Sequence, residues 1–547
     1  MMNVLHPRSS VWRRAPRASW PGRPAAQLAL VRALAAAGLA SFALVGADAR
    51  AQSPALPALP TGLAVVQGQA RVAVQGKQMT VTNSAGALLD WQSFSIGAGH
   101  GVRFEQPSAA SRVLNRVVGR DPSQILGSLT SNGQVWLVNP YGVLFGRDAR
   151  VDVGSLVVST LNIGNDDWRA GRLGLAAAAG DRDAALVNQG ELRTTAGGRV
   201  LLLGGSGGVR NEGLIVAPDG QVALAAGASV ELVDSATPNV AVRVQAPRGE
   251  VLNLGSVSVG GGRVDLTAAM VNQQGLVRAD AVAGSGGHIE LRAAGRTTLG
   301  AGSLTSATGS RGGDVRVLGT EVALLDDSTI DVSGSQGGGS VLAGGGRQGR
   351  DASVPNARAL YMGGRASIHA DANGRGDGGS IVLWSDEATR VYGSLSARGG
   401  AGGGNGGFIE TSGGHLDARP ASVRADAPAG AAGQWLLDPN DILITDDANT
   451  VDMTAGPSFT SLDDSAVISS STIEAALNDG NNVVVTTGHG GANSQPGDIT
   501  VRSANIRVAS KRRVSLTLAA ERDIVVQNSS IIGAAGEQEV DLDVTLN

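Results

Sequence analysis

The sequence predicts an all-β protein that forms a right-handed parallel β-helix (a solenoid), with an N-terminal cap and small β-hairpin excursions. Glycine makes up 80 of the 547 residues, without the every-third-residue spacing of collagen. Hydrophobic residues make up 42%, which is too many for a disordered chain. Aromatic residues are few, with 7 Trp, 3 Tyr and 6 Phe, and cysteine is absent. Small apolar side chains without disulfides suit a long, narrow core built by stacking.

The main evidence for this fold is an internal repeat. A glycine, one further residue and the start of an apolar strand recur at Gly198, Gly220, Gly262, Gly287, Gly313, Gly339, Gly379, Gly407 and Gly433. Six of the eight steps are 22 to 28 residues long, a period typical of solenoids. The strands alternate apolar and polar residues, as in Ile289–Ala293, so each buries one side. We interpret each repeat as one coil, stacked about 4.8 Å from the next. A β-propeller, with units of about 40 residues, is the alternative architecture.

Short motifs of asparagine followed by glycine precede several of the repeats. They begin at Asn188, Asn211, Asn253 and Asn272. Because asparagine and glycine tolerate positive φ, we expect them at tight corners between strands. The glycine-rich runs between residues 301 and 435 are interpreted as coil loops. One helix is predicted, opened by the capping box Ser471–Glu474 and ending near Gly480, as an excursion on the surface.

The N-terminus is predicted to be a secretory signal peptide. Arginines without acids come first, and an apolar run from Ala33 to Ala47 follows, with a small-residue site that places cleavage between Ala51 and Gln52. No other segment is expected to cross a membrane. Removing residues 1–51 takes away seven Arg and one Asp, so 44 basic and 48 acidic side chains become 37 and 47, a net charge of −10. This acidic balance argues against a nucleic-acid partner.

The most specific motif lies within residues 113–163. An apolar strand is followed by Asn139, Pro140, Tyr141 and Gly142. Asn115 lies in an earlier apolar segment, Val113–Val117. Asn-Pro followed by Gly after a strand forms a turn by its own chemistry. Residues 59–168 closely resemble the amino-terminal secretion domain of filamentous-haemagglutinin-type exoproteins of two-partner secretion systems.

The resemblance identifies a motif and leaves its role open. In that family the motif is Asn-Pro-Asn-Gly, so Asn139, Pro140 and Gly142 match while Tyr141 replaces the second Asn. A second family signature, Asn-Pro-Asn-Leu, is not found, and the chain is more similar to adhesin-like members than to haemolysin-like ones. The motif either orders the first coils as a turn or contacts the secretion partner directly.

What the resemblance implies is a secreted bacterial exoprotein. Its partner would be an outer-membrane β-barrel transporter with periplasmic modules, and outside the cell it would act as an adhesin that contacts glycans or proteins of host or neighbouring cells, with or without retention at the cell surface. The alternatives are the leader module of a larger toxin or binding protein, and a β-helix enzyme that acts on polysaccharides.

Four parts are expected along the chain. They are a signal peptide (1–51), a secretion domain with the first coils (52–180), glycine-rich coils (181–445) and further coils (446–547). The last part is expected to be truncated, because the alternating strand Val540–Leu546 has no cap after it.

No enzymatic site, cofactor or metal site is expected. The acid pairs Asp326-Asp327, Asp446-Asp447 and Asp463-Asp464 are interpreted as turns or charged edges, because adjacent residues on a strand point to opposite sides. The six histidines lack the spacing of metal ligands: His6, His100, His288, His369, His415 and His489.

One tripeptide remains as a candidate cell-attachment site. Arg375, Gly376 and Asp377 lie in a glycine-rich loop, where the tripeptide would be exposed. A chain this rich in Arg and Gly produces such triplets by chance at a rate of about 0.4 per sequence, so the match carries a high risk of being accidental.

Overall fold

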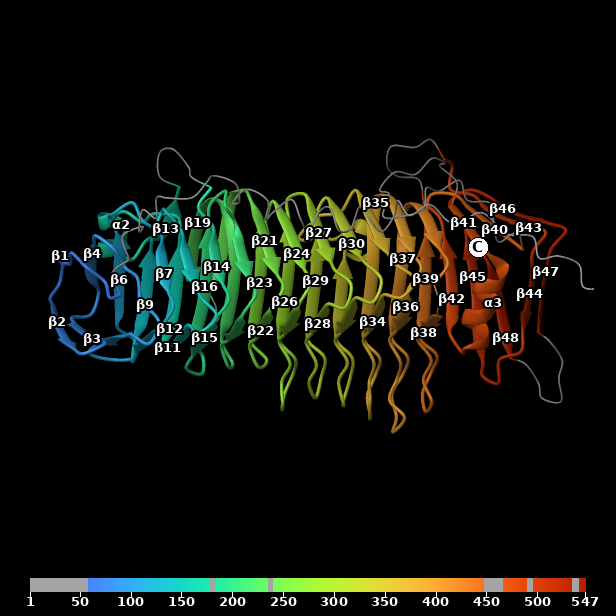
Figure 1. Cartoon of the computed structure of the whole chain (residues 1–547). Coiled ribbons are helices and arrows are strands. Elements are labelled where there is room, and N and C mark those ends of the chain that lie inside the picture. The colour runs from blue at the N-terminus through green and yellow to red at the C-terminus, as the bar shows by residue number, and fades with distance from the viewer. Residues whose placement is uncertain are drawn as a thin grey trace, which may run out of the picture. The chain divides into compact units, whose positions relative to one another are not determined.

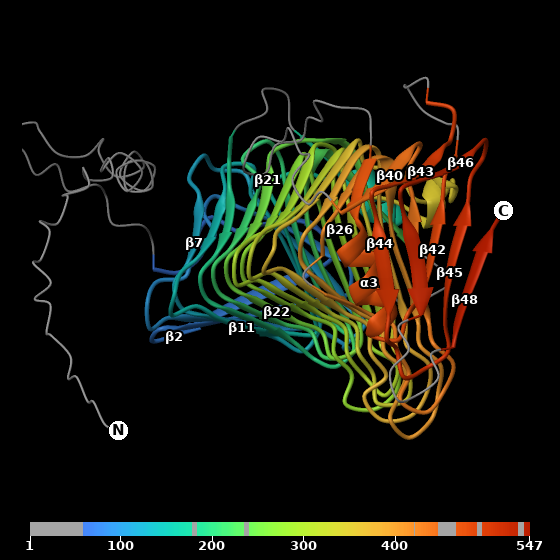
Figure 2. The ribbon, with the colours of Figure 1, turned by 90° about the vertical axis from the view of Figure 1, so that its right-hand side faces the viewer.

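The computed structural model describes residues 58–177, 183–234, 240–420, 422–446, 466–488, 495–533 and 541–547. They belong to one compact unit, Leu56–Asn547. Its coils stack along one axis as a parallel β-helix (Figure 1). Seen along that axis, the strands form three walls (Figure 2), here called face 1, face 2 and face 3. The predicted fold is confirmed.

Face 1 is a continuous parallel row in which each strand pairs with the equivalent strand of the next coil. Its strands are β4 (Ala87–Trp91), β6 (Arg112–Val117), β9 (Gln134–Val138), β12 (Ser155–Ser159), β16 (Arg199–Gly204), β19 (Gln221–Asp234), β23 (Arg263–Ala268), β26 (His288–Ala293), β29 (Asp314–Leu318), β32 (Ser340–Ala343), β35 (Ser380–Val391), β37 (Phe408–Ala418), β39 (Gln434–Asp438), β42 (Asn482–Thr486), β45 (Val514–Ala519) and β48 (Leu542–Leu546). The parallel pairing passes from β39 to β42 without a break, although the expected boundary at residues 445 and 446 lies between these two strands in the sequence.

Face 2 is made of shorter strands and of the C-terminal halves of β35 and β37. Its other strands are β7 (Ser123–Ile125), β10 (Val143–Phe145), β14 (Leu186–Asn188), β17 (Val209–Asn211), β21 (Glu250–Asn253), β24 (Met270–Gln273), β27 (Arg296–Leu299), β30 (Glu321–Leu324), β33 (Ala359–Met362), β41 (Ala466–Ser469), β40 (Ile442–Thr445), β43 (Ile499–Arg502) and β46 (Ile524–Gln527). β41 lies against both β37 and β40, so the chain doubles back at this point.

Face 3 consists of one parallel row, formed by the first thirteen strands named below, and of a separate parallel pair further along the axis, formed by the last two. Its strands are β3 (Gln78–Asn83), β5 (Gly101–Glu105), β8 (Ser128–Ser131), β11 (Arg150–Val153), β15 (Glu191–Thr194), β18 (Leu214–Val216), β22 (Ser256–Ser258), β25 (Leu276–Arg278), β28 (Leu304–Ser306), β31 (Thr329–Asp331), β34 (Ser367–His369), β36 (Ser394–Ser396), β38 (Ser422–Arg424), β44 (Asn505–Val508) and β47 (Ser530–Gly533). Loops from face 3 to face 1 project from the body as a row (Figure 1), as expected for the glycine-rich runs.

The cap and the excursions are antiparallel. At the N-terminal end, β1 (Ala64–Gln67) pairs with β4, and β2 (Ala70–Gln75) pairs with β3. β19 continues beyond face 1 as a hairpin with β20 (Val240–Pro247), and β13 (Leu173–Ala176) pairs with the other side of β19. Because β1 and β2 turn the chain against the coil direction, they close the first coil.

The core lies between the three faces and is filled by stacked aliphatic side chains. Val264, Ile289 and Val315 occupy the same position in consecutive coils and are fully buried. No single coil encloses these side chains, so each coil depends on its neighbours.

The repeated glycines meet backbone to backbone. A Cβ on Gly220 would lie 1.9 Å from the carbonyl oxygen of Gly198, and a Cβ on Gly262 would lie 1.9 Å from that of Gly220. No side chain fits in so short a distance. The glycine repeat therefore follows from the close contact of stacked coils.

The asparagines lie at the predicted corners for a different reason than expected. None of Asn188, Asn211 and Asn253 has a positive φ. They are fully buried and form a ladder: the Nδ2 of Asn188 donates to Oδ1 of Asn211 (2.8 Å), and Nδ2 of Asn211 donates to Oδ1 of Asn253 (2.7 Å). Asn253 then donates to Oε1 of Gln273 (2.6 Å), so Gln273, not Asn272, occupies the fourth rung. Stacking satisfies buried amides that would otherwise be costly.

The predicted helix is present, but two details were wrong. α3 (Ser470–Asn478) is capped by Ser469, whose extended backbone lets its side chain accept a hydrogen bond from the nitrogen of Ser471. The helix is not a surface excursion: Ile473 and Leu477 are buried in the main core, and α3 contacts β38 and β44 in the row of face 3. Within the described residues, no helix has both the length and the apolar character needed to span a membrane.

Candidate functional site

The predicted motif forms a closed turn between β9 and β10. The nitrogen of Gly142 donates to the carbonyl oxygen of Asn139 (3.1 Å). The Nδ2 of Asn139 donates to the Asp121 carbonyl and to Ser123 Oγ, each at 3.0 Å, and its Oδ1 accepts from the nitrogen of Tyr141 at 2.9 Å. Asn139 is completely buried. Its side chain therefore fixes the turn from inside the coil.

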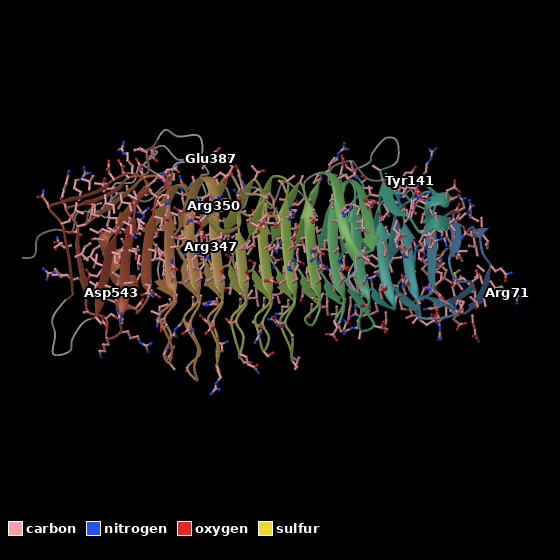
Figure 3. The ribbon with its side chains drawn as sticks, turned by 180° about the vertical axis from the view of Figure 1, so that it is seen from behind. Arg71, Tyr141, Arg347, Arg350, Glu387 and Asp543 are labelled. Atoms are coloured by element: carbon pink, nitrogen blue, oxygen red, sulfur yellow. The ribbon has the colours of Figure 1, made fainter. Side chains whose placement is uncertain are left out.

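The glycine of the motif is required by the backbone. Gly142 has a φ of 110°, which residues with a side chain rarely adopt. Its Cβ position lies 3.1 Å from the carbonyl oxygen of Ala185 in the next coil. Pro140 and Tyr141 are half-buried, and Tyr141 lies on the outside of the first coils (Figure 3). The outer half of the turn is therefore the part that a partner can reach.

Asn115 connects three consecutive coils. Its Oδ1 accepts from Nε1 of Trp91 (3.0 Å) and its Nδ2 donates to the carbonyl oxygen of Trp136 (3.2 Å). It is completely buried and pairs in register with Leu137, two residues before Asn139. The structure thus places both motif asparagines in neighbouring coils as internal supports. Among the described residues, no hydrogen bond joins the two side chains.

A second apolar cluster covers the outer side of face 1 in the first coils and was missed by the sequence reasoning. The ring of Trp168, on α2 (Asn165–Ala170), packs edge-to-face on Trp136 with centroids 5.3 Å apart. Its Nε1 donates to the Gly86 carbonyl (3.0 Å), and the Arg112 guanidinium lies 4.4 Å from its ring centroid. Trp168 is buried in this cluster and closes the outer side of the first coils.

An excursion of residues 344–358, here called the strap, lies on face 1 further along. The nitrogen of Gln348 donates to Oε1 of Glu410 (2.8 Å), and its Nε2 donates to Oδ2 of Asp438 (2.7 Å). The Arg347 guanidinium stacks 4.1 Å from the ring centroid of Phe408. Burial raises the pKa of Glu410 to about 7, helped by Asp438 and opposed by the Gln348 hydrogen bond and by Arg347. Glu410 is fully buried, so no substrate reaches it.

The other predicted groups are separate from one another. Asp326 and Asp327 lie in a turn, as expected, and Arg365 binds both oxygens of Asp327 (2.9 Å each). Asp446 lies in a bend after β40, whereas Asp447, Asp463, Asp464, His6 and His489 lie outside the described residues. Within the described ranges, no group of three or more His, Asp or Glu side chains is placed to hold a metal ion. The cleavage site Ala51-Gln52 is also outside the described residues.

The candidate attachment tripeptide lies in one of the projecting loops. Arg375 and Asp377 are exposed, and both are tied to the next loop: Arg375 Nε donates to the Gly402 carbonyl (3.1 Å), and Asp377 Oδ1 accepts from the nitrogen of Asn405 (2.6 Å). The tripeptide thus contributes to loop stacking, and its role in attachment stays a prediction.

Comparison with known proteins gives consistent matches. The TPS secretion domain family matches residues 57–341. A heme/hemopexin-binding protein of Haemophilus influenzae strain Rd is 42% identical over 106 residues, which are 19% of this chain and 12% of that protein. A second Haemophilus influenzae heme/hemopexin-binding protein is 44% identical over 77 residues, 14% of this chain and 8% of that protein. The chain thus spans a small share of these relatives.

A solved structure is similar over a larger share of the chain. The crystal structure of the HMW1 secretion domain from Haemophilus influenzae is 31% identical, covers 69% of this chain and 100% of its own, and superposes with a TM-score of 0.63. The likeness extends over most of the described coils.

Proposed function

The chain belongs to the TPS secretion domain family, and we propose that it is exported by two-partner secretion. A dedicated outer-membrane β-barrel transporter with periplasmic modules binds the first coils and passes the chain to the cell exterior. The observation that carries this proposal is the family match over residues 57–341. The chain then folds outside, each coil docking on the one before it.

Outside the cell the protein acts as an adhesin, retained at the surface of the cell that made it, by binding glycans or proteins of host or neighbouring cells. The long stacked faces support this, because they offer repeated side chains at a fixed spacing. It acts by binding and not by catalysis. In support, the carboxyl group of Glu410, whose pKa burial raises to about 7, is enclosed beneath the strap.

The motif contributes to export by ordering the first coils. Asn139→Ala removes three hydrogen bonds inside the turn, one that the side chain accepts and two that it donates. Gly142→Ala forces a side chain into a positive-φ position. Each is expected to lower the amount of protein outside transporter-expressing cells by about tenfold, because buried unsatisfied groups and strained backbone cost about 1–3 kcal/mol each. Immunoblots of medium, surface and periplasm measure this.

A matched control separates the motif from general coil stability. Asn253→Ala removes an equally buried asparagine from a later coil and is expected to lower the extracellular amount less. Wild-type extracellular levels of both Asn139→Ala and Gly142→Ala would show that the motif has no role in export.

A further inference from the structure

A continuous groove runs along the edge of face 1, parallel to the solenoid axis. Three adjoining hollows compose it, with volumes of about 550, 890 and 530 Å³. The first and second share Asp314, and the second and third share Ala432, Asn482 and Ser515. From Arg263 on β23 to Ser515 on β45 the groove crosses nine strands of face 1, which corresponds to about 38 Å at one strand spacing per coil.

One wall of the groove is bare backbone. Each loop enters face 1 through glycine pairs, such as Gly338-Gly339 and Gly378-Gly379. A Cβ on Gly379 would lie 2.1 Å from the Gly339 carbonyl oxygen, so no side chain can occupy this wall. The stacking of the coils therefore creates the hollow.

The floor is a row of side chains in register, one from each coil. In order they are Asp314, Ser340, Ser380, Phe408 and Gln434. Arg347 covers one side of the Phe408 ring. The four polar side chains of the row make no hydrogen bond or ion pair with another described residue. Three of the four polar side chains are half-buried and Asp314 is exposed. The row thus offers hydroxyl, amide and carboxylate groups to a ligand about every 4.8 Å.

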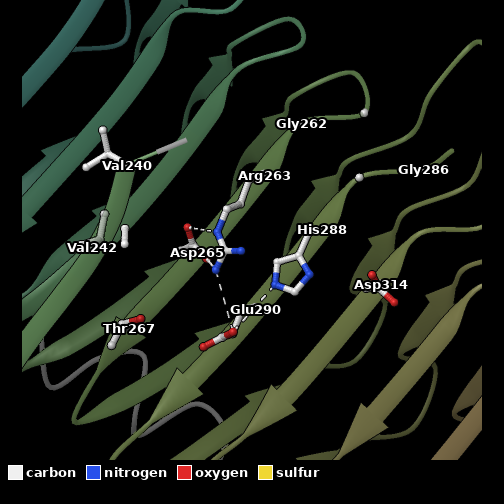
Figure 4. A pocket seen from close by; sticks show the side chains of 13 residues that line it. Val240, Val242, Gly262, Arg263, Asp265, Thr267, Gly286, His288, Glu290 and Asp314 are labelled. Atoms are coloured by element: carbon white, nitrogen blue, oxygen red, sulfur yellow. Dashed lines mark hydrogen bonds and ion pairs between the residues drawn. The ribbon is translucent and has the colours of Figure 1, made fainter. Parts of the chain in front are cut away.

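The charged groups at the N-terminal end of the groove are paired with one another (Figure 4). Arg263 Nη2 lies 2.6 Å from Asp265 Oδ1 and 3.9 Å from Glu290 Oε2, and His288 Nε2 lies 3.8 Å from the same Glu290 oxygen. At the other end, Arg513 is bound to Asp543, and the Arg512 guanidinium donates to the Pro428 carbonyl oxygen (3.1 Å). Between the ends the charged lining is the carboxylates of Asp314 and Asp377, which repel an anionic polymer.

The groove also offers no strand edge to a polypeptide. The nitrogen of Ser340 donates to the Gly313 carbonyl and that of Ser380 to the Gly339 carbonyl, each at 2.9 Å. Because neighbouring coils already use these backbone groups, an extended peptide cannot add as another strand. The side chains, by contrast, match the alternating donors and acceptors of sugar hydroxyl groups.

We propose that this groove binds a linear, uncharged polysaccharide along the solenoid axis. The inference rests on the proposed function as a surface-exposed binding protein and names its ligand class. Ser340, Ser380 and Gln434 hydrogen-bond to successive sugar units, and Phe408 packs against an apolar sugar face.

The test uses the full secreted chain and defined oligosaccharides. Ser340→Arg/Ser380→Arg fills the floor of the groove. Ser394→Arg/Ser422→Arg is the matched control, because these serines are also paired on consecutive coils but on face 3. Calorimetry with neutral gluco-, manno- and xylo-oligosaccharides of increasing length is expected to show binding that strengthens until the ligand spans the groove. The groove pair weakens it about tenfold or more, and the control less than about twofold.

Gln434→Ala, which needs no new space, is expected to weaken binding about threefold to tenfold. The proposal is overturned if no neutral oligosaccharide binds, if both arginine pairs weaken binding equally, or if heparin or an unstructured peptide binds more tightly. Both arginine pairs are expected to leave the extracellular amount unchanged. If the wild type is not exported, the proposed function is contradicted. Binding of oligosaccharides to the groove is then measured on protein refolded from cells, so the two proposals fail separately.

Discussion

Gly262→Ala is expected to destabilise the solenoid by about 3 kcal/mol or more. The new Cβ would lie 1.9 Å from the Gly220 carbonyl oxygen. That oxygen accepts the hydrogen bond from the nitrogen of Arg263 at 3.0 Å, so the coils cannot separate to make room without losing a stacking bond. Thermal unfolding followed by circular dichroism, together with limited proteolysis, measures the effect.

The matched control is Gly364→Ala. Gly364 has no atom within 4 Å of its Cβ position and no positive φ. The free energy of unfolding of this variant is therefore expected to differ from that of the wild type by less than about 0.5 kcal/mol. Equal unfolding temperatures for the two variants would contradict the view that the glycine repeat exists because coils meet backbone to backbone.

Glu410→Gln is expected to stabilise the protein by about 3 kcal/mol above pH 7 and to change little at pH 4.5. Burial raises the pKa of the folded carboxyl group to about 7 from an ordinary 4.5. Below pH 4.5 the group is protonated in both states. Between pH 4.5 and 7 the unfolded chain loses the proton while the folded chain keeps it. The free energy of unfolding of the wild type therefore falls by about 1.4 kcal/mol per pH unit in this window and then levels off.

Unfolding temperatures measured from pH 4.5 to 8 test this prediction, because the difference between variant and wild type is expected to grow over that window. Glu387→Gln serves as the control: its carboxylate is exposed and paired with Arg358 at 2.9 Å, so a small effect without this pH window is expected. A constant difference between Glu410→Gln and wild type at all pH values would contradict the buried, protonated state.

The coil fold could be predicted because its physical cause leaves a local signal. Glycines such as Gly220 recur wherever two coils touch through their backbones, and alternating strands show which side chains point inward. The asparagine corners were placed correctly but explained wrongly. A ladder such as Asn188 to Asn211 needs partners from another coil, and a single motif read as a local turn does not show them.

The site was predicted in part for the same reason. The turn at Asn139 and Gly142 is local and was expected. The cover formed by Trp168 on Trp136 joins residues from α2 and β9, and the contact of the strap with Glu410 joins segments 62 residues apart. Neither has a sequence signature. The groove arises from the register of many coils, such as the pairing of Ser340 with Ser380, and no single repeat shows it.

Two-partner secretion of this chain is tested most directly by measuring export of the wild type with and without its transporter. The full chain is expressed in a Gram-negative host that has no two-partner secretion system, and the intact extracellular or protease-accessible protein is quantified. The protein is expected to appear outside only when the partner outer-membrane transporter is co-expressed, and to stay in the periplasm otherwise. Equal amounts outside the cell in both cases would contradict this expectation.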